Sequence, residues 1–196
     1  MKNKTYNIVV TGVGGQGIIT LTKVISRAVL LSGLDVKMSE VHGLAQRGGH
    51  IECHVKFGKK VHSSLIPQGD ADLIIALEPL EALRCLWYAS RKTQLVINTA
   101  EIIPISKYQD KKEYPSLDKI VKEIKPFTKK IDQLDATEII KKAVGTTVPL
   151  NIYMLGYAFH KSFLPLKKEK LLESIKTTIS EKYFDINKKV FNLCTK

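Results

Sequence analysis

Hydrophobic positions in the first part of the chain follow two different periods. Residues 6–11 (YNIVVT) form a run rich in β-branched side chains and followed by glycine, which predicts a buried parallel strand. From Ile18 the apolar side chains recur every three or four residues, which predicts a helix that ends at Ser32-Gly33. Residues 35–41 (DVKMSEV) then predict a second strand.

The pattern changes between residues 50 and 66. Apolar and polar side chains alternate over 50–57, Gly58-Lys59-Lys60 turns the chain, and the alternation resumes over 61–66. Such alternation is typical of antiparallel strands with one face in water. We therefore predict a hairpin between these two segments, with His50, Glu52, His54 and Lys56 on its solvated side.

The parallel pattern resumes after residue 70 and then gives way to helices. Asp135, followed three residues later by Glu138, is a capping-box signal for a helix that Gly145 ends. The other elements predicted are strands at 72–77, 94–98 and 129–132, and helices at 79–90, 118–125, 149–161, 165–179 and 182–193.

These elements together predict an α/β fold. We expect a three-layer Rossmann-like domain with a mostly parallel sheet, one antiparallel hairpin and a helical C-terminal part. A single domain would span residues 1–196, with a core over about 6–160 and a helical extension over about 161–196.

The formal charge of +12 suggests nucleic-acid binding at first, and a basic nucleic-acid-binding module stays an alternative, but the composition argues against it. Only four of the 31 basic residues are arginine, the side chain on which base recognition mainly relies. A solvated lysine-rich face or an acidic protein partner remain as explanations. No apolar run reaches the roughly 18 residues of a membrane span, and no signal peptide is visible, so we expect a cytoplasmic protein.

Cysteine and histidine spacing argues against a metal held by this chain. Cys53, Cys85 and Cys194 are far apart in sequence, and no Cys-x-x-Cys occurs. In a strand, His50 and His54 would be about 13 Å apart, too far to share one zinc ion. We therefore expect no metal site and no catalytic residue of the nucleophile–histidine type.

Gly12, Gly14 and Gly17 match G-x-G-x-x-G between a predicted strand and a predicted helix. One interpretation is a dinucleotide site, with Glu40 as the acidic residue for the ribose. The other is a tight turn that lets another protein surface approach. Gly15 and Gln16 within the motif are not typical of nicotinamide sites, which favours the second interpretation.

Five sequence blocks then indicate a family. They occur in the order 10–17 (VTGVGGQG), 40–43 (EVHG), 46–49 (QRGG), 76–83 (ALEPLEAL) and Asn98-Thr99. Together they resemble the gamma domain of the 2-oxoacid:ferredoxin oxidoreductases, and among stand-alone forms they are most similar to the beta subunits of indolepyruvate enzymes. The resemblance covers residues from about 6 to about 160 and includes Asn151 and Gly156.

This resemblance implies a division of labour. A larger partner subunit would carry thiamine diphosphate and the iron–sulfur clusters, coenzyme A would accept the acyl group, and ferredoxin would accept the electrons. The present chain would bind none of these cofactors alone and would shape the site or its access by coenzyme A. An independent NAD(P)- or flavin-dependent Rossmann oxidoreductase is the alternative. The residues expected at the cofactor-binding or interface surface are Gly12, Gly14, Gly15, Gln16, Gly17, Glu40, His42, Gln46, Arg47, Gly48, Gly49 and Asn98.

Overall fold

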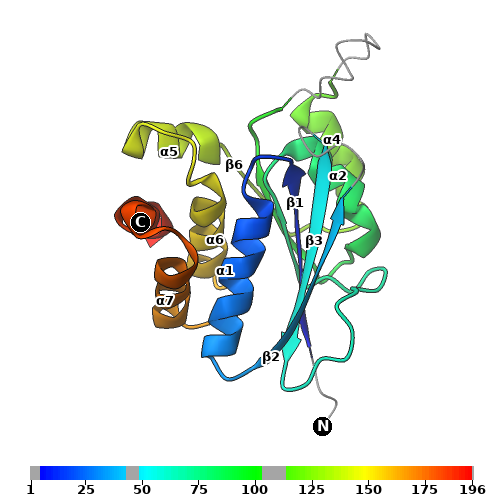
Figure 1. Ribbon diagram of the computed structural model, residues 1–196. Coiled ribbons are helices and arrows are strands. Elements are labelled where there is room, and N and C mark those ends of the chain that lie inside the picture. The colour runs from blue at the N-terminus through cyan, green and yellow to red at the C-terminus, as the bar shows by residue number, and fades with distance from the viewer. Residues whose placement is uncertain (1–4, 43–48, 103–113, 196) are drawn as a thin grey trace.

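A six-stranded mixed sheet forms the middle layer of the computed structural model, which describes residues 5–42, 49–102 and 114–195 (Figure 1). The strand order is β2-β3-β1-β4-β5-β6, and β3 alone runs against its neighbours. The strands are β1 (Tyr6–Val13), β2 (Asp35–His42), β3 (His50–Gly58), β4 (Leu73–Ala76), β5 (Gln94–Asn98) and β6 (Ile131–Leu134). The predicted three-layer α/β fold with a mostly parallel sheet is confirmed.

Helices cover both faces of this sheet (Figure 1). One face carries α1 (Ile18–Leu31), α5 (Ala136–Val144), α6 (Leu150–His160), α7 (Lys168–Thr178) and α8 (Phe184–Phe191). The other face carries α2 (Pro79–Arg84), the 3-10 turn η1 (Cys85–Tyr88) and α4 (Leu117–Ile124). Ile8 and Val10 of β1 belong to the first core and Val9 to the second, because alternate side chains of a strand point to opposite faces. Two short 3-10 turns, η2 (Glu181–Tyr183) and η3 (Leu193–Thr195), flank α8.

The predicted hairpin between residues 50–57 and 61–66 is wrong, and the antiparallel pairing lies elsewhere in the sheet. β3 pairs antiparallel with β2 on one edge and with β1 on the other, whereas residues 61–66 form no strand. Both edges of β3 are hydrogen-bonded to neighbouring strands, so residues 61–66 have no free edge of β3 with which to pair. Instead the Val61 N–H donates to the Asp35 carboxylate at 2.8 Å, and Val61 and Ile66 bury their side chains.

The prediction of a solvated face on 50–57 is wrong. Glu52 and His54 are buried, because η1 and the segment that contains Ile66 cover this side of β3. The tyrosine ring of Tyr88 stands edge-on to the His54 ring, with 4.8 Å between their centroids. The alternation in the sequence therefore marks two chemically different buried faces, and solvent reaches neither fully.

The C-terminal helices are built into the same core as the sheet. The Ser174 hydroxyl of α7 donates to the Val24 carbonyl of α1 at 2.6 Å, while Val190 and Phe191 of α8 lie in the α1-side core. A division into a core over about 6–160 and a helical extension stays a proposal. No helix in the described ranges is long and apolar enough to cross a membrane.

Local capping follows the sequence closely. Asp135 accepts the Glu138 N–H at 2.9 Å at the start of α5, and Gly145 ends that helix with a φ of 75°. The helix predicted from Pro79 is divided into α2 and η1, and α7 begins at Lys168, three residues later than predicted.

Gly156 provides a test of the contact between α6 and α8. A Cβ added there would lie 2.3 Å from the Phe191 carbonyl oxygen, and a helix backbone cannot move aside cheaply. We expect Gly156→Ala to lower the free energy of unfolding by about 3 kcal/mol, at the upper end of overpacking costs. Chemical denaturation measures this, with exposed Lys176→Ala as the control. An unchanged or raised stability would contradict the packing described.

Candidate functional site

The turn over residues 12–17, here called the glycine turn, joins β1 to α1 at the carboxyl edge of the sheet. Gly17 caps α1 with a φ of 76°, a conformation that favours glycine, and its carbonyl accepts the Leu21 N–H at 2.9 Å. The same carbonyl accepts the Asn151 side-chain amide at 2.9 Å. A Cβ on Gly17 would lie 2.5 Å from that amide nitrogen, so the glycine is also required for close contact with α6.

Gln16 fixes the glycine turn from within. Its Oε1 accepts the Val13 N–H at 2.7 Å, and its Nε2 donates to the Leu77 carbonyl at 2.8 Å. A Cβ on Gly12 would lie 2.6 Å from Gln16 Oε1, which explains why position 12 requires glycine. The residue that departs from a typical dinucleotide motif therefore has a structural role, which reasoning from the sequence missed.

Asn98 continues this arrangement across the sheet. It is fully buried, its Nδ2 donates to the Leu77 carbonyl at 3.1 Å and to Thr137 Oγ1 at 3.0 Å, and its Oδ1 accepts the Thr137 N–H at 3.3 Å. The Leu77 carbonyl thus accepts side-chain amides from both Gln16 and Asn98. Through this one oxygen the ends of β1, β4 and β5 are tied together.

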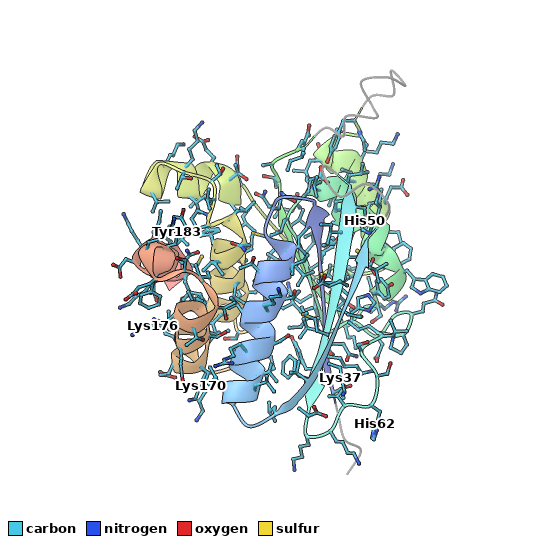
Figure 2. The ribbon with its side chains drawn as sticks, viewed as in Figure 1. Lys37, His50, His62, Lys170, Lys176 and Tyr183 are labelled. Carbon is cyan, nitrogen blue, oxygen red and sulfur yellow. The ribbon has the colours of Figure 1, made fainter. Side chains whose placement is uncertain are left out.

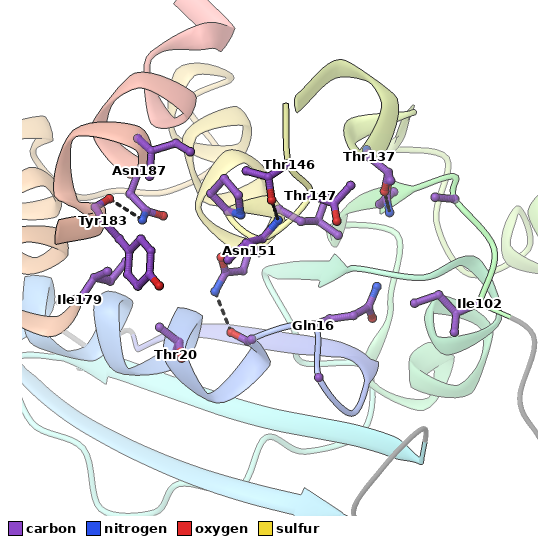
Figure 3. A pocket seen from close by; sticks show the side chains of 18 of the residues that line it. Gln16, Thr20, Ile102, Thr137, Thr146, Thr147, Asn151, Ile179, Tyr183 and Asn187 are labelled. Atoms are coloured by element: carbon purple, nitrogen blue, oxygen red, sulfur yellow. Dashed lines mark hydrogen bonds between the residues drawn. The ribbon is translucent and has the colours of Figure 1, made fainter. Parts of the chain in front are cut away.

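A cavity of about 770 Å³ opens beside the glycine turn, between α1, α6 and α8 (Figure 3). Its volume lies in the range of small-molecule sites, roughly 300–1,000 Å³. Amide, hydroxyl and apolar groups line it, and among its described lining residues Glu101 is the sole charged side chain. Figure 3 shows Thr20, Asn151 and Tyr183 around the opening near α1. The amide and hydroxyl groups of this lining can hydrogen-bond a neutral polar chain.

Glu40 does not meet the glycine turn. β3 lies between β2 and β1, so two interstrand steps separate Glu40 from β1, and the side chain is exposed. At the end of β4, which does adjoin β1, Glu78 is buried and caps α2 by accepting the Glu81 N–H at 3.0 Å. Burial raises the pKa of the Glu78 carboxyl, against the lowering effect of its hydrogen bond from Tyr114. Neither acid is placed to bind a ribose, which weakens the dinucleotide interpretation.

The remaining expected residues are only partly described. Gly49 lies beside the glycine turn, since its carbonyl accepts the Gly14 N–H at 2.9 Å, and Gly15 is exposed. His42 ends β2, but its side chain lies outside the described part. Gln46, Arg47 and Gly48 lie outside the described residues. The structure therefore brings Gly12, Gly14, Gly15, Gln16, Gly17, Gly49 and Asn98 to one edge.

A buried charged cluster, which reasoning from the sequence also missed, lies on the face of β3 that η1 covers. Glu52 accepts from His54 Nε2 at 2.9 Å, from the Tyr88 hydroxyl at 2.8 Å and from the Cys85 thiol at 3.2 Å. Burial alone would raise the pKa of Glu52, but these donors and His50 outweigh it and hold the pKa well below its usual range. Burial, with the nearby Glu52 charge, raises the pKa of the Cys85 thiol. Within the described ranges, no group of three metal-ligating side chains could hold an ion.

Comparison with known proteins gives consistent results at the level of sequence. The model of the pyruvate ferredoxin/flavodoxin oxidoreductase family matches residues 7–195. Indolepyruvate oxidoreductase subunit IorB of Archaeoglobus fulgidus is 41% identical over 187 residues, covering 95% of this chain and 92% of the relative.

Two solved structures share the fold. Pyruvate oxidoreductase subunit PORC of Thermotoga maritima has a TM-score of 0.72 at 19% identity, over 98% of this chain and 96% of that one. The 2-oxoglutarate:ferredoxin oxidoreductase of Magnetococcus marinus, solved with 2-oxoglutarate, coenzyme A and succinyl-CoA bound, has a TM-score of 0.72 at 17% identity. That match covers 97% of this chain but 30% of the larger chain, so the fold occurs there as one part of a longer polypeptide.

Gln16 offers a direct test of the glycine turn. Gln16→Ala removes two hydrogen bonds and leaves the Val13 N–H without its acceptor, so we expect a loss of about 1–3 kcal/mol in the free energy of unfolding. Denaturant titration measures the loss, and the exposed Gln68→Ala serves as the matched control. If both variants unfold like the unmodified protein, Gln16 does not hold the turn.

Proposed function

The chain belongs to the pyruvate ferredoxin/flavodoxin oxidoreductase family, and we propose that it is the small subunit of a 2-oxoacid:ferredoxin oxidoreductase acting on indolepyruvate or another aryl pyruvate. The 41%-identical relative, itself named as an indolepyruvate oxidoreductase subunit, supports this substrate class. The match covers 92% of that relative, so the similarity is not confined to one part of it.

In the proposed complex a larger subunit carries the thiamine diphosphate and the iron–sulfur clusters. Those groups supply the decarboxylation of the 2-oxoacid and the transfer of two electrons to ferredoxin, with the acyl group passing to coenzyme A. The present chain contributes contact and shape. We place the complex in the cytoplasm, where reducing conditions suit the free thiols of Cys53, Cys85 and Cys194.

The observation that carries this proposal is the composition of the carboxyl edge. Gly15 is exposed there with open space where a side chain would be, and the neighbouring cavity is lined by amides, hydroxyls and apolar groups. Ligands of open α/β sheets approach at this edge. An edge whose lining is mostly neutral fits a surface that meets a partner carrying the reactive groups.

Coenzyme A is the ligand of the complex that best fits the cavity. Its pantetheine arm combines two amides with a flexible apolar stem, which matches the hydroxyl groups of Thr20, Thr147 and Tyr183 beside Ile179. The first turn of α1 adds backbone N–H groups that favour an anion. The Magnetococcus marinus protein, of which 30% matches this chain, was solved with coenzyme A bound, which is consistent with this part of the proposal.

Arg47 tests the contact with the larger subunit. In the sequence it stands two residues before Gly49, the residue whose carbonyl accepts the Gly14 N–H. After co-expression with the larger subunit, we expect Arg47→Ala to weaken subunit binding or to reduce 2-oxoacid-dependent ferredoxin reduction, while folding changes by no more than about 0.5 kcal/mol. The control is Arg91→Ala, since Arg91 is exposed and precedes β5, away from the carboxyl edge of the sheet. A wild-type complex with a sharply lowered thermal midpoint would mean that Arg47 is structural.

Val148 tests the access of coenzyme A to the cavity. Its side chain is 77% exposed on the cavity rim. Val148→Glu places a carboxylate where the phosphates of coenzyme A would pass, so we expect the KM for coenzyme A to rise about threefold or more, with kcat retained. Val148→Thr should leave both constants unchanged. An unaltered KM in the glutamate variant would remove the cavity from the route of coenzyme A.

A further inference from the structure

His50 stands at the point where β3 begins and where the chain returns to the glycine turn. Its side chain is 27% exposed, whereas both carboxylates that it meets are buried. Nδ1 forms a short contact with Glu81 of α2, and Nε2 lies 3.7 Å from Glu52 Oε2. Figure 2 places His50 at the α2 end of the sheet and His62 at the opposite end.

Charges around His50 are balanced. Arg84 Nη1 donates to the free oxygen of Glu81 at 2.8 Å, so two carboxylates face two cations when His50 is protonated. The other donors to Glu52 are the Tyr88 hydroxyl, the Cys85 thiol and His54, whose Nδ1 accepts the Ile66 N–H at 3.4 Å. Loss of the proton from His50 would remove one of the two cations that contact Glu81.

The backbone connects this cluster directly to the glycine turn. His50 pairs with Val13 in the β1–β3 ladder, and the preceding residue, Gly49, accepts the Gly14 N–H at 2.9 Å. Gln16 holds the other end of the turn to the Leu77 carbonyl, just before α2. The turn is therefore fixed to the β4–α2 connection from two sides, once through Gln16 and once through His50 and Glu81.

We propose that His50, held between Glu52 and Glu81, is a positioning residue that fixes Gly49 against Gly14 and so sets the glycine turn for the larger subunit. This inference rests on the proposed function, in which the turn meets that subunit. His50 acts through the backbone and touches neither substrate nor cofactor in this arrangement.

The ionic contact gives the positioning a distinctive pH dependence. The contacts with the Glu52 and Glu81 carboxylates raise the pKa of His50 from 6.5 to about 9, although burial acts in the opposite direction. A folded-state pKa above the unfolded value means that the contribution is fully present below pH 6.5 and is lost as the pH rises through about 9. A residue that mattered through packing alone would have no such dependence.

The test compares His50→Gln with the unmodified chain, with exposed His62→Gln as the matched control. The dissociation constant for the larger subunit is measured from pH 7 to pH 10, well below every variant's thermal midpoint. At pH 7.5 we expect His50→Gln to bind about three- to tenfold more weakly, and above pH 9.5 we expect the two chains to converge. Glu81→Gln should move the loss of affinity to lower pH.

A second measurement needs no partner. Amide hydrogen exchange at Gly14 in the isolated chain should be faster in His50→Gln than in the unmodified chain at pH 7.5. In His62→Gln the exchange rate at Gly14 should equal that of the unmodified chain. Equal protection of Gly14 in His50→Gln, or a pH-independent difference in affinity, would overturn the positioning role. Failure of the unmodified chain to bind the larger subunit, with the Gly14 difference present, would overturn the proposed function instead.

Discussion

The insertion of β3 between β1 and β2 is the constraint on which the rest of the structure depends. Because β3 runs antiparallel to both neighbours, its first residue comes to the same edge as the last residue of β1. That position brings Gly49 to the glycine turn and His50 to α2. It also moves Glu40 two strands away from β1, so a fold with a Rossmann-like order of elements lacks the acidic contact of a dinucleotide site.

Hydrogen bonds to a backbone carbonyl and to a buried carboxylate stabilise the carboxyl edge of the sheet. The Leu77 carbonyl accepts the amides of Gln16 and Asn98, which ties three strand ends without any ionic group. On the other face, buried Glu52 accepts hydrogen bonds from His54, Tyr88 and Cys85. Without them a buried carboxylate would lower the free energy of unfolding. The edge is thus preorganised within this chain, which lowers the ordering cost of meeting a partner.

Much of the fold could be predicted because its signals are local. The β-branched run of β1, the period of α1 and the cap at Asp135 depend on neighbours in sequence. The partner of β3 could not be predicted, since alternation fixes the faces of a strand but not its neighbours. Alternation also does not show which distant segment covers a polar face, so Glu52 and His54 were predicted to be solvated although η1 covers them. At the site, the glycines and Asn98 could be placed at one edge, whereas the role of Gln16 depends on Leu77, far along the chain.

The central claim is that this chain acts through contact with a larger subunit. The most direct test titrates the purified larger subunit with the purified chain and follows 2-oxoacid-dependent ferredoxin reduction in the presence of coenzyme A. The account predicts no turnover by the chain alone and activity that rises to a plateau at a fixed molar ratio of the two subunits. Full activity of the larger subunit without this chain, or turnover of an NAD(P)-linked substrate by this chain alone, would contradict it.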